Sequence, residues 1–372
     1  MRIASIFAYM EKYDYENLFF CQDRALNFKA IIAIHDTTLG PATGGCRMWQ
    51  YDHEMDAVED ALRLARGMTY KYAAAGVNLG GGKAVIIADP NRKDRESIFR
   101  VLGKFINRLG GKYITGEDVG TTLQDMEYIC METEYVVTLP AYLGGAGDIA
   151  PMTALGVICA MQACCMRVFG SDSLEGKTAA VQGLGAVGHN VVEQLSNLGA
   201  KLVVTDIDPQ KVKDIAQRFK VKAVDTDKIY DVDCDIFCPC ALGGIINSDT
   251  LPRFKCKIIC GSANNQLKDE RHGEILEQKA MVYAPDYIAN AGGTIYDTDR
   301  LEVGNVSHQR GRQKVSRIYQ NLERVFEIAD RDKIPTYLAA DRMAEESYNL
   351  AISLANYRTT AFFMYTLKSA RV

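Results

Sequence analysis

The chain has 372 residues, enough for two domains, and its 48% of hydrophobic residues suffices for two ordinary globular cores. A formal net charge of −4 argues against a broad basic surface, so nucleic acid is not an expected partner. Eleven cysteines, an odd number in a chain with no recognisable export signal, indicate reduced thiols rather than a disulfide framework.

Residues 3–10 form an apolar segment that resembles a short signal peptide. The segment lacks a clear cleavage site of small residues and runs directly into the charged residues 11–16, so we predict an amphipathic first helix here. No segment is expected to reach the apolar length that a membrane span needs. We therefore expect a soluble, cytoplasmic protein with no membrane partner.

The N-terminal part of the chain carries a mixed α/β pattern. Apolar segments typical of strands occur at 28–34 and 83–88, and residues 55–72 between them repeat alanine and leucine at helical spacing. The glycine-rich residues 144–147 then precede a new helical segment at 153–168, and such a stretch is typical of a hinge between domains.

The most informative pattern is a complete βαβ unit. An apolar strand at 178–182 leads into Gly183-x-Gly185-x-x-Gly188, a helical segment follows to residue 198, and a second apolar strand covers 201–205. The first glycine permits a tight turn, the second lets the backbone approach a pyrophosphate, and the third allows close packing of helix on strand. The helix N-terminus offers free N–H groups to the phosphates, so we predict a dinucleotide site.

Asp206 ends the second strand and indicates which dinucleotide binds. Its carboxylate can accept hydrogen bonds from a ribose 2′-hydroxyl but would repel a 2′-phosphate, and Asp208 adds a second negative charge. NAD is therefore favoured over NADP. The alternative is that Asp206 only caps a turn.

Strands and helices continue to alternate after Asp206. Segments 234–238, 257–260 and 281–283 are typical of parallel strands, and the loops at their carboxyl ends would line a crevice for the reactive end of the cofactor. Residues 315–369 are mostly helical, with a break at 334–335. We expect these helices to return to the first domain, with a free-standing helical tail as the alternative.

Cysteine spacing raises the question of a metal site. Cys234, Cys238, Cys240, Cys256 and Cys260 crowd together, but their spacings lack paired C-x-x-C motifs, and the five histidines of the chain are scattered. Buried cysteines at strand positions explain this pattern better, and we predict no metal.

Two lysines and one aspartate stand beside glycines in the N-terminal part. Residues 80–82 precede Lys83 without completing a phosphate loop, so the pattern indicates a lysine beside bare backbone that a small ligand can approach. Lys71 ends the preceding helix, and Asp118 lies between Gly116 and a second glycine. One lysine can bind a substrate carboxylate, the other can act as general base if burial and a like charge depress its pKa, and the aspartate can relay the proton. Solvated lysines and a loop-capping aspartate are the alternative.

These residues resemble the Glu-Leu-Phe-Val amino acid dehydrogenase family, and most closely its leucine dehydrogenases. The resemblance runs from about residue 7 to residue 350, in segments 31–41, 44–47, 61–71, 80–83, 117–120, 173–178, 239–243, 263–266, 283–287 and 290–293.

The resemblance implies NAD-dependent, reversible oxidative deamination of an L-amino acid to a 2-oxo acid and ammonia. It assigns Lys83 as the lysine that activates water, Asp118 as the proton shuttle, and Lys71 as the residue that holds the substrate carboxylate, with Gly44, Met68 and Asn265 nearby. The expected cofactor-binding residues are Gly183, Leu184, Gly185, Ala186, Val187, Gly188, Asp206, Thr153, Cys240, Ala241, Asn264 and Asn265.

The same resemblance implies an α/β protein of two domains and a homo-oligomer, from dimer to octamer. Residues 1–147 are expected to form a mixed-sheet domain for substrate binding, catalysis and oligomerisation. Residues 148–330 are expected to form a Rossmann-type, doubly wound NAD domain, and residues 331–372 to form C-terminal helices that pack back on the first domain.

The chain departs from the leucine enzymes around the side-chain pocket. Thr43 replaces a leucine, Gly116 an alanine, Thr294 a valine and Asp297 another valine, while Arg300 breaks an Asp-Glu-Leu sequence. A buried carboxylate at Asp297 needs a partner, which could be Arg300, a backbone donor or the substrate.

Four interpretations follow from these departures. If Asp297 turns away, the pocket still accepts branched aliphatic side chains; if it faces the pocket, the substrate has a larger polar or basic side chain. Gly116, shared with phenylalanine dehydrogenases, favours an aromatic substrate. A NAD-binding regulatory protein without turnover is the most distant alternative, because it has no need of Lys71, Lys83 and Asp118 together.

Overall fold

The computed structural model describes residues 5–349, which divide into two compact units. Of the described residues, 5–147 and 344–349 form unit 1, and 148–343 form unit 2. The division after Gly147 falls at the end of the glycine-rich segment. Each unit is described by itself.

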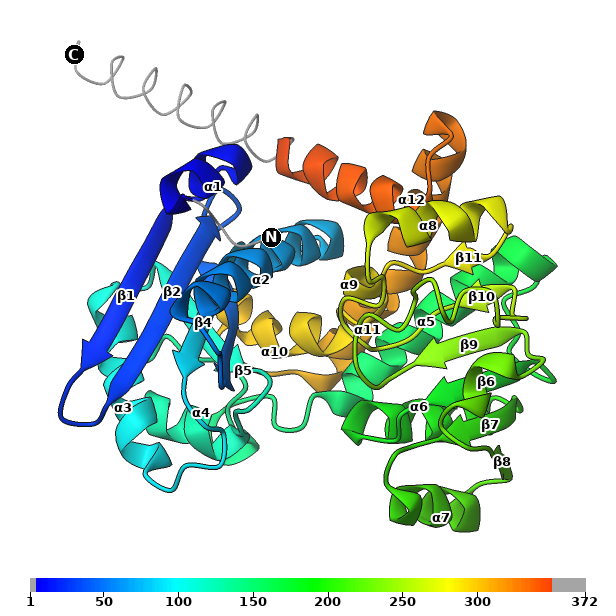
Figure 1. Cartoon of the computed structure of the whole chain (residues 1–372), viewed down its shortest axis with the longest axis horizontal. Helices are drawn as coiled ribbons and strands as arrows, with labels where there is room; N and C mark the ends of the chain where they lie inside the picture. Colours follow the sequence, from blue (N-terminus) through cyan, green and yellow to red (C-terminus); the bar gives the residue numbers. More distant parts are fainter. Residues whose placement is uncertain (1–4, 350–372) are drawn as a thin grey trace, which may run out of the picture. The chain divides into compact units, whose positions relative to one another are not determined.

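Unit 1 is a five-stranded mixed sheet with helices on both faces (Figure 1). Its strands lie in the order β1-β2-β4-β3-β5, with β1, β2 and β4 antiparallel and β4, β3 and β5 parallel. Its elements are α1 (Ile6–Tyr13), β1 (Asn17–Asp23), β2 (Phe28–Asp36), β3 (Ala42–Trp49), α2 (Glu54–Ala75), β4 (Gly80–Ile87), α3 (Arg95–Arg108), β5 (Tyr113–Glu117), α4 (Leu123–Cys130) and the 3₁₀ turn η1 (Ala141–Leu143).

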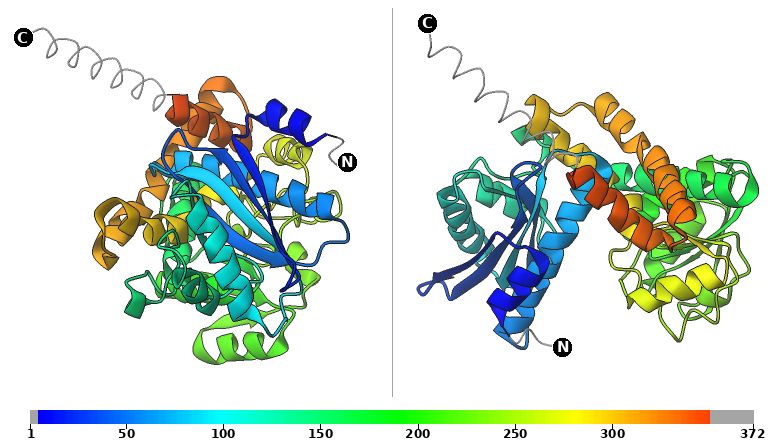
Figure 2. Two further views of the ribbon diagram at one scale, coloured as in Figure 1. Left: turned by 90° about the vertical axis from the view of Figure 1, so that its left-hand side faces the viewer. Right: turned by 90° about the horizontal axis from the view of Figure 1, so that it is seen from above.

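Alternate side chains of β2 contribute to two different hydrophobic cores of unit 1. Ile32 and Ile34 face the core with α3 and α4, whereas Ile31 and Ala33, which alternate with them, face the core with α2. Side chains of a strand point alternately to opposite faces, so one strand serves both layers. The helix α2 runs along the sheet (Figure 2), and the predicted strands and helix of this region are confirmed with small shifts of their ends.

Unit 2 is a six-stranded parallel sheet in the order β11-β10-β9-β6-β7-β8. In chain order this is the arrangement 6-5-4-1-2-3 of a doubly wound dinucleotide-binding fold, whose order reverses between β6 and β9. Its elements are α5 (Ala150–Phe169), β6 (Thr178–Gln182), α6 (Ala186–Asn197), β7 (Lys201–Thr205), α7 (Pro209–Arg218), β8 (Val221–Ala223), η2 (Lys228–Asp231), β9 (Ile236–Pro239), β10 (Ile258–Ile259), α8 (Glu270–Gln278), β11 (Val282–Tyr283), α9 (Asp286–Ala289), α10 (Gly292–Val303), α11 (His308–Ser316) and α12 (Ile318–Asp332). The expected α/β fold class is confirmed.

The expectation that no segment has the length and apolarity of a membrane span is wrong for α5. This helix of 20 residues passes that test, yet 61% of its most apolar window is buried. It packs against α6, α10, α11 and α12, so it is the core helix of unit 2.

The C-terminal part is helical as far as it is described. After α12, the helical conformation is interrupted at residues 333–335, and a last helix covers residues 336–349. Residues 344–349 group with unit 1, whereas residues 331–343 group with unit 2. The predicted helical residues 350–369 lie outside the described part of the chain.

Candidate active site

Lys83 and Asp118 form a buried ion pair in unit 1. Lys83 lies on β4 and Asp118 follows β5, and Lys83 Nζ lies 3.1 Å from Asp118 Oδ2. The side chains are 5% and 17% exposed. The two residues that the sequence assigned to proton transfer are therefore in direct contact.

Arg47 is a third member of this group, which the sequence reasoning missed. Its Nε lies 2.9 Å from Asp118 Oδ2, and its guanidinium also binds Asp60 at 3.0 Å. Tyr51 donates a hydrogen bond of 2.6 Å to Asp60 Oδ2. The sequence did contain a signal for this role, because Arg47 is a single charge between Cys46 and Met48 on a largely buried strand. An arginine at such a position needs an anionic partner.

The surroundings of Asp118 set its charge state. Burial acts to raise the pKa of Asp118, but the positive charges of Lys83 and Arg47, together with their hydrogen bonds, outweigh burial and lower it. Asp118 is thus a carboxylate at neutral pH, held in its charged form by Lys83 and Arg47.

The glycines before Lys83 have a different function from the predicted one. They belong to β4, and an added Cβ at Gly81 would lie 2.1 Å from Thr69 Oγ1, while one at Gly82 would lie 2.8 Å from the Tyr113 ring. The space beside them is filled by protein, so the expectation of a small ligand against bare backbone is wrong. Gly81 instead lets β4 pack closely on α2, and Gly82 leaves room for the Tyr113 ring, so both sides of the backbone next to Lys83 are packed.

Gly44 and Met68 lie beside this strand. An added Cβ at Gly44 would lie 1.9 Å from the Gly82 carbonyl oxygen and 3.1 Å from Met68 Cγ. Lys71 lies on the same helix as Met68, three residues later, and is partly buried. The predicted substrate residues Gly44 and Met68 are thus adjacent to the backbone that carries Lys83.

Thr43 and Gly116 are tightly enclosed. Thr43 is fully buried on β3 and its hydroxyl donates to the Pro41 carbonyl at 3.2 Å. An added Cβ at Gly116 would lie 2.9 Å from Thr138 Oγ1 and 3.0 Å from Val137 Cγ2. The glycine at 116 therefore makes room for the chain at 137–138.

The glycine loop of unit 2 has the geometry that its sequence predicts. Gly183 has φ 97°, a conformation that other residues rarely adopt. An added Cβ at Gly188 would lie 2.0 Å from the Gly183 carbonyl oxygen, whereas one at Gly185 meets nothing within 4 Å. Gly185 is also the N-cap of α6, so open space lies where the helix presents its free N–H groups.

Asp206 follows β7 and is tied to this loop. One of its oxygens accepts a hydrogen bond of 2.6 Å from Leu184 N–H and the other accepts one of 2.8 Å from Asp208 N–H. Asp206 is therefore more than a cap of its own turn, because it connects the glycine loop to the end of the second strand. Ala186 and Val187 begin α6 beside it.

The remaining cofactor candidates lie on loops and helix starts of unit 2. Cys240 N–H donates to the Gln182 carbonyl at 2.7 Å, which continues the pairing of β9 with β6. Ala241, Asn264 and Asn265 are exposed, and Asn265 has the positive φ of 51°. Asn264 Oδ1 accepts a bond of 2.7 Å from Asn290, a residue that the sequence did not single out.

Thr153, Thr294 and Asp297 lie on the helices α5 and α10. Thr153 donates a hydrogen bond of 3.1 Å to the Ile149 carbonyl, and an added Cβ at Gly293 would lie 2.3 Å from its Oγ1. Thr294 is partly buried, and Asp297, one turn further along α10, is only 3% exposed.

The cysteines of unit 2 are free thiols, as are all eleven of the chain. Among residues 5–349, no three His, Cys, Asp or Glu side chains form a group that could hold a metal ion.

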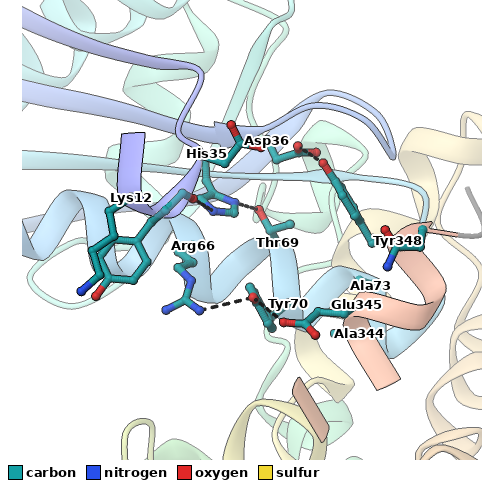
Figure 3. Close-up of a pocket in the computed structure, with 13 residues that line it drawn as sticks. Lys12, His35, Asp36, Arg66, Thr69, Tyr70, Ala73, Ala344, Glu345 and Tyr348 are labelled. Atoms are coloured by element: carbon teal, nitrogen blue, oxygen red, sulfur yellow. Dashed lines mark hydrogen bonds between the residues drawn. The ribbon is translucent and has the colours of Figure 1, made fainter. Parts of the chain in front are cut away.

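Unit 1 contains a cavity of about 410 Å³, away from Lys83, which the sequence did not predict (Figure 3). His35 is buried in its wall, with Nδ1 2.8 Å from Thr69 Oγ1 and Nε2 3.1 Å from the Tyr13 carbonyl. A carbonyl only accepts, so Nε2 carries the hydrogen. Burial lowers the pKa of His35, which keeps the ring neutral. Tyr348 donates a hydrogen bond to Asp36 across the cavity, connecting the last helix to β2.

Two family descriptions match most of the chain. The Glu/Leu/Phe/Val dehydrogenase dimerisation domain matches residues 20–135, and the Glutamate/Leucine/Phenylalanine/Valine dehydrogenase family matches residues 144–302.

Characterised relatives agree along almost the full length. The chain is 57% identical to a leucine dehydrogenase of Geobacillus stearothermophilus, over 92% of both chains, and 48% identical to a phenylalanine dehydrogenase of Lysinibacillus sphaericus, over 90% of this chain and 88% of that one. The crystal structure of L-tryptophan dehydrogenase from Nostoc punctiforme is similar with a TM-score of 0.82 at 42% identity, covering 93% of this chain and 99% of that chain. These findings confirm the resemblance of the sequence, and the chain is an oxidoreductase that belongs to the Glu/Leu/Phe/Val amino acid dehydrogenase family.

Proposed function

We propose that this enzyme catalyses the reversible, NAD-dependent oxidative deamination of a branched-chain L-amino acid, with leucine as the preferred substrate. In the forward direction, the amino acid, NAD⁺ and water give the 2-oxo acid, ammonium, NADH and a proton. The observation that carries the proposal is the buried contact of Lys83 with Asp118 in a chain that also has a dinucleotide fold.

The glycine loop supports a dinucleotide cofactor. Open space at Gly185 next to the N-terminus of α6 suits a pyrophosphate, and the Asp206 carboxylate at the end of β7 suits a ribose diol. A bound nicotinamide supplies the hydride acceptor for the substrate α-carbon. Activity with NADH that exceeds activity with NADPH supports this assignment, and equal activity would contradict it.

The residues of unit 1 supply the proton chemistry. Lys71 holds the substrate carboxylate as a point charge. Lys83 Nζ, in its neutral form, removes a proton from the water that adds to the imino carbon, and Asp118 Oδ2 at 3.1 Å accepts a proton from Lys83. Because Lys83 is almost fully buried, the exchange of protons with bulk water is slow unless Asp118 relays them.

A branched aliphatic substrate follows from the similarity to leucine dehydrogenases at 53–58% identity. The second candidate is a substrate with an aromatic, polar or basic side chain. It is favoured by the buried carboxylate of Asp297, by Thr43 and Thr294, and by the relatives named for phenylalanine and tryptophan.

The first experiment measures NADH oxidation with ammonium across branched, aromatic, acidic, hydroxylated and basic 2-oxo acids. Highest kcat/KM on branched acids supports the proposal. Highest kcat/KM on basic or polar acids supports the second candidate, and Asp297→Val then moves preference toward branched acids. An enzyme that binds NADH and turns over no acid would contradict both.

We also propose that the enzyme is a cytoplasmic homo-oligomer. The match of residues 20–135 to a dimerisation domain supports this. Light scattering coupled to gel filtration tests it, and a monomer at assay concentration would contradict it.

A further inference from the structure

Two cysteines lie in contact at the carboxyl end of β9 in unit 2. Cys238 is on the strand and Cys240 directly follows it, and their Sγ atoms are 3.5 Å apart. Residues two apart on an extended strand point to the same side, so this contact is built into the backbone. The two thiols therefore face one another in the folded chain.

Accessibility distinguishes Cys240 from most other cysteines. Of the eleven, all within the described residues, nine are buried and only Cys130 and Cys240 are partly exposed. Cys238 is fully buried behind Cys240. A reagent from solvent thus reaches the pair at Cys240 first.

The environment favours a thiolate at Cys240. A hydrogen bond from Cys238 lowers the pKa of Cys240, and hydrogen bonds from Ser262 lower it further, although burial opposes them. Burial and the contact with Cys240 raise the pKa of Cys238. Cys240 is therefore the more nucleophilic thiol and Cys238 its proton donor.

We propose that Cys240 is an oxidation site for hydroperoxides and that Cys238 is its resolving thiol. The Cys240 thiolate attacks the O–O bond of the hydroperoxide, takes one oxygen to form a sulfenic acid, and releases an alcohol or water. The Cys238 sulfur then attacks the sulfenic sulfur, a Cys238–Cys240 disulfide forms, and water leaves. The pair loses two electrons, which reduce the hydroperoxide, so atoms and electrons balance.

The disulfide can form only with local strain, which makes it reversible. Two steps along an extended strand span about 6.6 Å between Cα atoms, within the range of roughly 4.4–6.8 Å that disulfides adopt. A separation near the upper limit strains the bond, and strained disulfides are readily reduced by thiols.

Oxidation at this position would act on the glycine loop. An added Cβ at Gly188 would lie 3.2 Å from Cys240 Cβ, and one at Gly183 would lie 2.9 Å from the Cys240 carbonyl carbon. Bond formation brings the sulfurs from 3.5 Å to about 2.05 Å and draws Cys240 away from this packed position. The expected consequence, which rests on the proposed function, is weaker NADH binding.

The test treats the full-length enzyme with hydrogen peroxide and maps its peptides without reduction. We expect a Cys238–Cys240 disulfide, restored to thiols by dithiothreitol, and a sulfenic acid trapped by dimedone at Cys240 in Cys238→Ala. Cys130→Ser is the matched control and should oxidise at Cys240 like the wild type. An unmodified Cys240, or a disulfide that joins other cysteines, would overturn the proposal.

NADH binding, measured by fluorescence before and after peroxide, separates the two hypotheses. If the disulfide forms and the reduced enzyme binds NADH, we expect at least a tenfold loss of affinity that dithiothreitol reverses, about 1.4 kcal/mol. If the disulfide forms in an enzyme that never binds NADH, the oxidation site stands and the proposed cofactor fails. If the enzyme binds NADH equally well before and after oxidation, the proposed effect on the glycine loop is overturned.

Discussion

A single oxygen of Asp118 binds two cations: Oδ2 lies 2.9 Å from Arg47 Nε and 3.1 Å from Lys83 Nζ. Arg47 is anchored on its other side by Asp60, which also accepts a hydrogen bond from Tyr51. Arg47 thus fixes the orientation of the carboxylate and stabilises its charge, while Lys83 is the partner with which, in the proposed mechanism, it exchanges protons.

Replacing Arg47 should change the pH dependence of the reaction. Arg47 helps to lower the pKa of Asp118, so Arg47→Gln raises that pKa, and protonated Asp118 appears at a higher pH. We expect the acidic limb of the kcat/KM profile to move to higher pH, with partial rescue by Arg47→Lys. The control Arg100→Gln, which removes a surface partner of Glu132, should leave the profile in place.

Replacing Lys83 should remove catalysis without removing the cofactor site. Lys83→Ala lacks the general base, and we expect kcat to fall by roughly 10²–10⁴-fold. NADH titration by fluorescence should give an unchanged Kd, since the glycine loop lies in unit 2. Lys112→Ala, at an exposed lysine, provides the control. Wild-type turnover in Lys83→Ala would contradict the assignment.

The glycine loop allows a matched comparison of two alanine substitutions. At Gly185 the new methyl group meets only open space, so Gly185→Ala should fold normally and lose cofactor affinity alone. At Gly188 the methyl group would lie 2.0 Å from a backbone oxygen, so Gly188→Ala should also lower the melting temperature. NADH titration and thermal unfolding of both variants check this. If Gly185→Ala binds NADH with the affinity of the wild type, no phosphate lies beside Gly185.

Asp299 should contribute to stability in a pH-dependent way. It is 1% exposed and binds Arg310 at 2.5 Å and Lys314 at 2.8 Å. Burial acts to raise the pKa of Asp299, but these two partners outweigh it and lower the pKa. A depressed folded-state pKa gives stability that is present above the unfolded value near 4 and is lost as the pH falls through the folded value.

Chemical unfolding of Asp299→Asn measures this contribution. We expect a loss of about 2–3 kcal/mol at pH 7, because a buried pair loses its anion, and a smaller difference from the wild type below pH 4. Asp330→Asn, in the exposed pair with Arg167, should cost less than about 1 kcal/mol. A loss at pH 7 no greater than that of the control would contradict the role of Asp299.

Local sequence determined the elements that carry the ion pair of unit 1 and the glycine loop of unit 2. Three features can be read from a few neighbouring residues each, and each has a strong local physical cause: the period-2 pattern of β2, the glycine spacing of 183–188 and the terminal Asp206. The fold class was readable for the same reason, whereas the family came from resemblance. The roles of Lys83 and Asp118 came from resemblance, and the structure adds that the two side chains touch.

Only the tertiary structure decided what each residue faces. The order β4-β3-β5 brings Arg47 and Asp118 together across 71 positions of sequence, and no local pattern contains that distance. Close packing of β4 on α2 at Gly81 and on Tyr113 at Gly82 likewise decided that the glycines beside Lys83 face protein rather than ligand. A residue's conformation follows from its neighbours in the chain, but its charge state and contacts follow from burial and long-range partners, which exist only after the strands have paired.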